Sequence, residues 1–161
     1  MTELTKILES KVKIRFTDCD PFNHLNNSRY IDYIVTERSE QLLDNYGLDI
    51  YQLAKEKGIG WVTGQTQISY LFPAFPNEVV VIETQLIGYS EKSLVFEGMM
   101  WNHDKTQLKA VMWAKLVHFH PQTQKSHSHS KELMQLFGQV INPLPMESDF
   151  ETRIKNVKRI S

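Results

Sequence analysis

The sequence has 161 residues, of which 41% are apolar and 23% are charged, a composition typical of one globular domain with a sizeable core. The formal net charge of −1 provides no overall basic field, so nucleic acid is not an expected partner. Cys19 is the only cysteine, which excludes an internal disulfide.

Targeting signals are not expected either. The first residues mix acidic and basic side chains without the apolar stretch of a secretory signal peptide. No apolar run reaches the length of a membrane span. A lone thiol suits a reducing compartment. We therefore expect a cytoplasmic protein with no membrane span.

The first half of the chain predicts a strand, a turn and a long helix. Residues 11–16 alternate basic and apolar side chains, with Phe16 on the apolar face, as in a half-buried strand. Residues 18–26 are rich in Asp, Pro and Asn and predict a turn. A helix is predicted over 27–46, ended by Gly47, and its apolar face is so wide that other structure must surround it.

The second half changes to extended segments. Strands are predicted at 61–71, 78–90, 92–102 and 108–120. Short turn-rich links join the last three strands, which favours an antiparallel meander. A shorter helix is predicted at 130–140 and a polar tail at 147–161. The fold class is therefore α+β, with a curved antiparallel sheet wrapped around one long central helix.

We expect one domain over residues 1–161. Its core spans about 10–120, and the C-terminal helix and polar tail span about 130–161.

Residues 15–37, RFTDCDPFNHLNNSRYIDYIVTE, resemble the opening of the hotdog-fold thioesterases, in particular the 4-hydroxybenzoyl-CoA thioesterase-like group. That group has a strand, then D-x-D-x-x-G-H-x-N-N-x-x-Y, then the central helix. The matching positions are Asp18, Asp20, His24, Asn26, Asn27 and Tyr30. Asn23 stands where the family commonly has Gly, and Asn is the residue that best tolerates a left-handed backbone there. Lys92 and Ser93 resemble the family's K-S segment.

The resemblance implies thioester hydrolysis at the start of the helix. Asp20 could act as general base on a water molecule or attack the carbonyl directly, and both routes stay open. Unpaired backbone N–H groups near residues 24–27 would polarise the carbonyl. His24 is the second catalytic candidate, which would bind the carbonyl, orient Asp20 or brace the turn.

Other residues of the motif are candidates for binding the substrate. They are Asn23, Asn26, Asn27, Tyr30, Lys92 and Ser93. Tyr30 would line the acyl pocket. The simpler interpretation is that the Asp and Asn side chains only cap the helix. Glu37 shares the helical face of Tyr30 and is a further acid candidate, whereas Asp18 is expected to be structural.

The substrate class follows from the resemblance as an acyl-CoA, cleaved to a carboxylic acid and CoA. Alternatives are an acyl carrier protein thioesterase, a non-catalytic acyl-CoA-binding protein, and a hydratase, whose motif has a longer Asp-to-His spacing. The resemblance also implies a homodimer or homotetramer with sheets paired edge to edge and active sites at the interface. No cofactor is expected.

Two further sets of polar residues are expected to be solvated. The histidines are His118, His120, His127 and His129, and they lack the spacing of a zinc site, so no metal is expected. The basic residues of the tail are Arg153, Lys155, Lys158 and Arg159.

Overall fold

The computed structural model describes residues 3–145 and 149–158. The strands are β1 (Leu8–Lys13), β2 (Gly60–Tyr70), β3 (Val79–Tyr89), β4 (Ser93–Asn102), β5 (Leu108–His120) and β6 (Lys125–Ser126). They form one antiparallel sheet in the order β1-β3-β4-β5-β2, and β6 pairs with the end of β5. The helices are α1 (Tyr30–Tyr46), α2 (Ile50–Lys57), α3 (Lys131–Val140) and α4 (Phe150–Lys158), and 3-10 turns cover Phe16–Asp18 and Asn27–Arg29.

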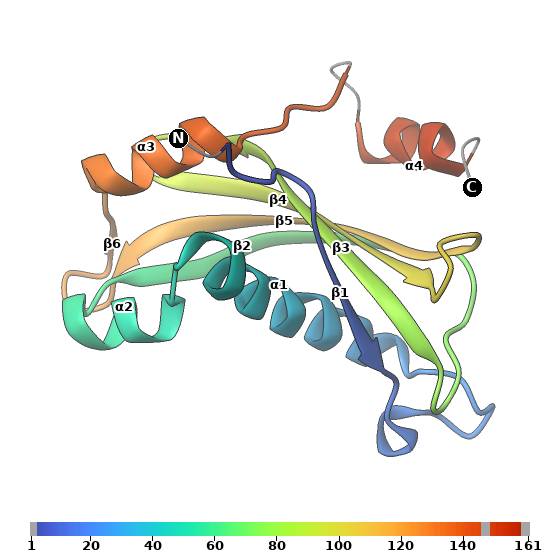
Figure 1. Ribbon diagram of the computed structural model, residues 1–161. Helices are drawn as coiled ribbons and strands as arrows, with labels where there is room; N and C mark the ends of the chain where they lie inside the picture. The colour runs from blue at the N-terminus through green and yellow to red at the C-terminus, as the bar shows by residue number, and fades with distance from the viewer. Residues whose placement is uncertain (1–2, 146–148, 159–161) are drawn as a thin grey trace.

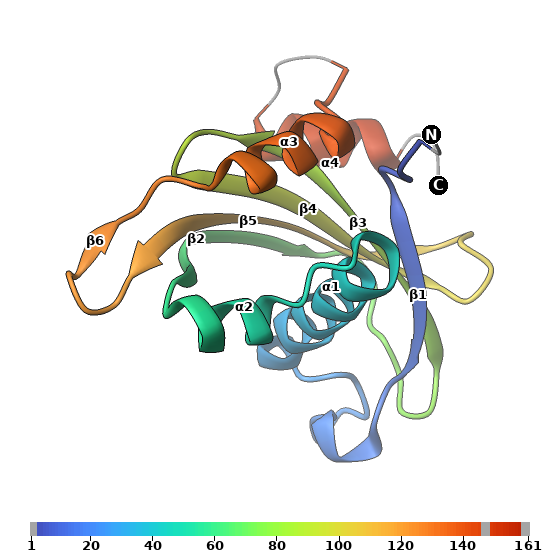
Figure 2. The same ribbon diagram turned by 60° about the vertical axis from the view of Figure 1, so that its left-hand side comes forward.

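The sheet curves around α1 (Figures 1 and 2). Tyr30 and Ile34 of α1 pack against inward-facing strand residues, which are Val80, Ile82, Phe96, Met100, Ala110, Met112 and Ala114. Gly98 of β4 allows the close approach of the helix, because a Cβ there would overlap with Cγ2 of Ile34. The predicted α+β class, with a curved antiparallel sheet around one long helix, is confirmed.

Most of the predicted elements lie where the sequence placed them. The meander β3-β4-β5 is confirmed, as is the helix cap, since Gly47 has φ 67° and donates its N–H to the carbonyl groups of Leu42 and Leu43. The prediction for the first strand was wrong at its end. β1 stops at Lys13, and Phe16 lies in a 3-10 turn with 71% of its surface exposed.

Two helices were missed because their sequences are largely polar. Asp49 caps α2 by accepting hydrogen bonds from the amides of Tyr51 and Gln52. Helix α4 lies in the predicted polar tail, but Phe150, Ile154 and Val157 repeat at helical spacing. These three side chains are buried against Val81, Met99, Trp101 and Val111, on the face of the sheet opposite α1 (Figure 1).

The tail is also held by a buried ion pair, so the expectation of a solvated Arg153 was wrong. Glu97 of β4 is 1% exposed and accepts hydrogen bonds from Nε and Nη2 of Arg153, at 2.8 and 2.9 Å. Trp113 Nε1 and Gln85 Nε2 also donate to this carboxylate. Lys155 and Lys158 are exposed, and Arg159 lies outside the described residues.

Two of the four histidines are buried, which corrects the expectation that all are solvated. His118 and His129 stack at 4.8 Å between ring centroids. Nε2 of His129 accepts a 3.0 Å hydrogen bond from Nε1 of Trp61, and its Nδ1 lies 3.0 Å from the carbonyl of Ser90. Burial lowers the pKa of both histidines, which favours their neutral forms.

No helix within residues 3–145 and 149–158 is long and apolar enough to cross a membrane.

Replacing Gly98 with Ala is expected to lower the free energy of unfolding by about 1–3 kcal/mol, because the added methyl group must displace Ile34 or bend β4. Urea denaturation measures the change. Gly88→Ala is the matched control, since a Cβ there would lie 3.9 Å from Cβ of Val95, an ordinary contact. Equal stabilities of the two variants would contradict the close packing of α1 on β4.

Candidate active site

The Asp20 side chain closes the turn of residues 18–26, which leads into α1. Its Oδ1 accepts hydrogen bonds from the amides of Phe22 and His24, at 2.9 and 3.2 Å. The backbone of Asp20 also bonds to His24 (N–H to carbonyl, 2.7 Å) and accepts from the amide of Asn23 (2.9 Å). Within the described residues Oδ2 of Asp20 has no hydrogen-bond partner. One carboxylate oxygen is therefore fixed by backbone amides, and the other is available to a substrate or water molecule.

Asn23 adopts the conformation that glycine favours. Its φ is 65°, in the left-handed region. Asn is among the few non-glycine residues that adopt this region regularly, so the turn forms without glycine.

The amides near the start of α1 are mostly occupied, which changes the expected set of oxyanion donors. The amide of Leu25 donates to the carbonyl of Ala74, and that of Asn26 to the carbonyl of Asp18. The amide of His24 is held by Asp20, as described above. Among residues 24–27, only the amide of Asn27 has no acceptor in the described part of the chain.

The two asparagines differ in what they do. The side chain of Asn26 caps the 3-10 turn by accepting hydrogen bonds from the amide and hydroxyl of Ser28, at 3.0 and 2.8 Å. The carbonyl of Asn27 accepts from the hydroxyl of Tyr70 at 3.0 Å. The capping interpretation therefore accounts for Asn26, while the Asn27 side chain is exposed.

His24 and Tyr30 contact the β2–β3 loop (residues 71–78). The His24 ring meets Phe75 edge to face, with centroids 5.5 Å apart. Tyr30 is 2% exposed, and its hydroxyl accepts a hydrogen bond from the amide of Ala74 at 3.1 Å. Tyr30 thus joins the helix to the loop and does not line the apolar cavity beside α1.

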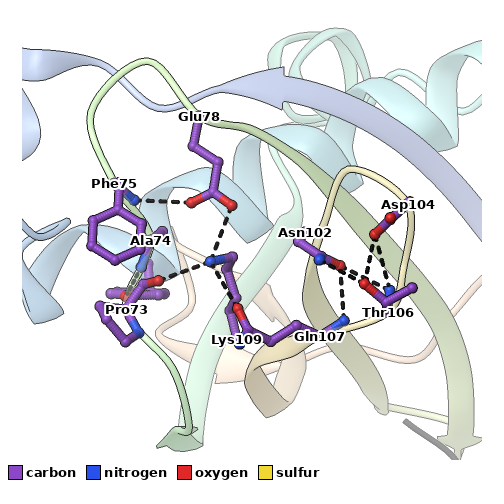
Figure 3. Close-up of polar contacts among 10 residues, drawn as sticks. Pro73, Ala74, Phe75, Glu78, Asn102, Asp104, Thr106, Gln107 and Lys109 are labelled. Carbon is purple, nitrogen blue, oxygen red and sulfur yellow. Dashed lines mark hydrogen bonds and ion pairs between the residues drawn. The ribbon is translucent and has the colours of Figure 1, made fainter.

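The β2–β3 loop is itself anchored by a buried lysine (Figure 3). Lys109 of β5 is 1% exposed, and its Nζ lies 2.8 Å from the carbonyl of Pro73 and 3.0 Å from Oε2 of Glu78. Oε1 of Glu78 accepts from the amide of Phe75. This anchor could not be predicted from the sequence, because Lys109 lies in a strand segment far from the motif.

The two other acids named from the sequence have partners that set them apart from Asp20. Asp18 accepts a 2.6 Å hydrogen bond from the hydroxyl of Tyr33. Burial, followed by this bond, raises the pKa of Tyr33. Burial also raises the pKa of Glu37, although a hydrogen bond with Ser10 of β1 opposes the shift. Glu37 therefore faces β1.

An apolar cavity of about 320 Å³ lies beside α1. Its walls come from α1, α2, α3 and the inner face of β2–β5, and it extends along α1 from Ile31 to Tyr46. Ile31 is in the first turn of the helix, next to the Asp20 turn. Apolar side chains dominate the lining, with a few polar groups that include Arg38, which is typical of a small-molecule site.

Lys92 and Ser93 lie at the other end of the sheet. Ser93 pairs with Val117, whereas the β2–β3 loop is anchored near the end of the ladder where Met100 pairs with Ala110. Seven residues of β4 separate these two ends, or roughly 20 Å of strand. A single chain therefore does not bring Lys92 and Ser93 together with Asp20.

Among the described residues, no group of three or more His, Cys, Asp or Glu side chains is arranged to hold a metal ion.

Comparison with known families matches residues 14–150 to the thioesterase-like superfamily. Long-chain acyl-CoA thioesterase FadM of Escherichia coli (strain K12) is 24% identical over 134 residues, which cover 83% of this chain and 99% of FadM. Slr0204, a 1,4-dihydroxy-2-naphthoyl-CoA thioesterase from Synechocystis, superimposes with a TM-score of 0.74 at 12% identity, covering 85% of this chain and 99% of its own. SAV2348 from Staphylococcus aureus, solved in complex with CoA, gives 0.77 at 13% identity, with 94% and 95% covered.

A sheet curved around one long helix is the fold of the hotdog thioesterases, and the Asp20 turn lies where that helix begins. Because the family match spans most of the chain, this protein belongs to the thioesterase-like superfamily. It is a thioester hydrolase.

Replacing Lys109 with Met is expected to loosen the β2–β3 loop, because Glu78 and the Pro73 carbonyl lose their shared cation. In hydrogen exchange, the Leu25 amide of the variant should exchange at least about 10-fold faster than in wild type, with amides of the β4–β5 ladder as the internal reference. Lys105→Met, which removes a lysine paired with Glu9 and Glu83, is the matched control. Equal Leu25 exchange in both variants would contradict the anchoring role of Lys109.

Proposed function

We propose that this protein is an acyl-CoA thioesterase that releases a carboxylic acid and CoA, with Asp20 as its reactive carboxylate. The observation that carries the proposal is the state of Asp20. One of its oxygens is fixed by two backbone amides, the other is open, and the turn leads directly into the helix that lines an apolar cavity. The acyl-CoA activity of FadM supports the substrate class.

Two routes are consistent with this geometry. As a general base, Asp20 accepts a proton from water while the hydroxide adds to the thioester carbonyl. As a nucleophile, its open oxygen adds to the same carbon and gives a mixed anhydride that water then hydrolyses. In both routes the C–S bond breaks and CoA leaves as the thiolate, which is then protonated. The amide of Asn27, at the positive end of α1, is the donor best placed for the oxyanion.

The other residues of the motif support these groups. His24 shares its backbone bonds with Asp20 and packs on Phe75, so it braces the turn beside the reacting carbonyl. Asn23 provides the left-handed corner, and Asn26 caps the start of the helical segment. Tyr30 holds the turn against the β2–β3 loop.

The protein is also proposed to act as a homo-oligomer built on the edge of β2. This strand pairs with β5 on one side, and residues 62–67 are all exposed. An open strand edge presents unpaired N–H and C=O groups, which a second copy can satisfy. Lys92 and Ser93 would then reach CoA from the partner subunit. A monomeric mass in light scattering would contradict this assembly.

Thiol release from acyl-CoA, measured on wild type, Asp20→Ala and Asp20→Asn, tests the catalytic assignment. Both variants should lose about 100-fold or more in kcat, because either route needs the carboxylate charge. Asp20→Asn keeps the oxygen that accepts from Phe22 and His24, so it separates loss of charge from loss of the turn. Asp32→Asn, an exposed acid in the first turn of α1, is the control that should remain active.

Full activity in folded Asp20→Asn would return Asp20 to a capping role and overturn the assignment. Acyl-CoA binding by wild type without turnover would instead identify a non-catalytic binding protein.

A further inference from the structure

Arg38 is a buried cation in the wall of the apolar cavity. It lies on α1, is 8% exposed and lines the cavity together with apolar residues that include Val35, Leu42 and Phe96. A buried arginine is normally met by a carboxylate, because an uncompensated charge in an apolar environment is costly. The groups around Arg38 therefore show whether its charge is compensated within the protein.

The guanidinium has few partners in the protein. Nη1 donates a 2.9 Å hydrogen bond to Oγ1 of Thr84, and the Phe96 ring lies 5.4 Å from Cζ. Within the described residues, no carboxylate lies within ion-pair distance of Arg38, and Nε and Nη2 have no acceptor. By contrast, the two other most buried cations, Lys109 and Arg153, each have a glutamate partner.

The titratable groups around Arg38 do not provide a negative charge that pairs with its guanidinium. Glu37 precedes it but interacts with Ser10 of β1, and Tyr46 forms a hydrogen bond with the carbonyl of Thr5. Burial lowers the pKa of Arg38 to about 10, so the side chain is still cationic at neutral pH. A charged fork with unused donors therefore belongs to a residue in the wall of the cavity.

We propose that Arg38 binds a carboxylate at the far end of the acyl group, and that the preferred substrates are ω-carboxyacyl-CoA thioesters of medium length. This inference rests on the proposed acyl-CoA thioesterase function. Arg38 lies seven residues after Ile31, or about 10 Å along the helix, so an acyl chain that passes Ile31 and ends at Arg38 is of medium length. The planar fork of arginine matches a carboxylate through two parallel hydrogen bonds.

The test compares decanoyl-CoA with sebacoyl-CoA, which differ by a terminal carboxylate. Wild type should hydrolyse sebacoyl-CoA with a higher kcat/KM than decanoyl-CoA. Arg38→Gln should lower kcat/KM for sebacoyl-CoA about 10- to 100-fold more than it lowers kcat/KM for decanoyl-CoA, the range for a hydrogen bond to a charged group. Arg38→Lys should fall between the two, since it keeps the charge without the fork. Lys55→Gln, which removes an exposed cation of α2, is the control for net charge.

The outcomes separate this inference from the function on which it rests. Decanoyl-CoA hydrolysis with a kcat/KM equal to or higher than that for sebacoyl-CoA overturns the role of Arg38 and leaves the thioesterase function intact. Equal losses on both substrates in Arg38→Gln also overturn it.

If wild type hydrolyses neither substrate, the acyl-CoA thioesterase activity is contradicted for chains of this length. Binding measurements then decide the role of Arg38. Calorimetry then measures binding of both substrates to Asp20→Asn. Tighter binding of sebacoyl-CoA than of decanoyl-CoA, with the difference lost in the Asp20→Asn, Arg38→Gln double variant, would support the carboxylate-binding role of Arg38. Equal affinities would overturn it. The comparison of substrates on wild type needs no variant, so a folding defect at Arg38 does not remove the test.

Discussion

The buried ammonium group of Lys109 is the constraint on which the geometry of the site depends. A charge with 1% exposure must be met inside the protein, and its partners, Glu78 and a backbone carbonyl, both belong to the β2–β3 loop. The loop is thereby fixed to the sheet. Ala74 lies in the same loop. Its carbonyl accepts a hydrogen bond from the amide of Leu25 in the turn, and its amide donates to the hydroxyl of Tyr30, the first residue of α1. The sheet thus determines where the Asp20 turn lies.

Helix α1 then links the Asp20 turn to the cavity. Its N-terminal end carries the turn and the open amide of Asn27, while its flank from Ile31 to Tyr46 lines the cavity. The helix can approach the sheet closely because Gly98 leaves space for Ile34. A helix has a fixed rise per residue, so the separation between the Asp20 turn and the far end of the cavity is set by the fold.

Features encoded by neighbouring residues could be predicted from the sequence. Alternation identified the strands, and the motif around Asp20 identified a turn whose bonds are local. Features that depend on distant residues could not be predicted in this way. Lys109 and Glu78 are 31 positions apart in the chain and carry no motif. Glu97 and Arg153 pair across 56 positions, and this pairing, with the apolar stripe of α4, turns an apparently polar tail into a docked helix.

The buried position of Arg38 also depends on residues distant in the sequence and could not be predicted from it. Beside Glu37, Arg38 has the appearance of an ordinary surface charge on an amphipathic helix, and only the packing of α3 and β4 around α1 reveals that it is enclosed. In the proposed binding mode, the charges of Asp20 and Arg38 are opposite in sign. Asp20 would then repel an anionic terminus and Arg38 would attract one, so a chain with a distal carboxylate would bind productively in one orientation. An unpaired buried cation lowers the stability of the protein without substrate. A bound carboxylate would offset this cost and orient the acyl chain, as expected for a group that acts in binding.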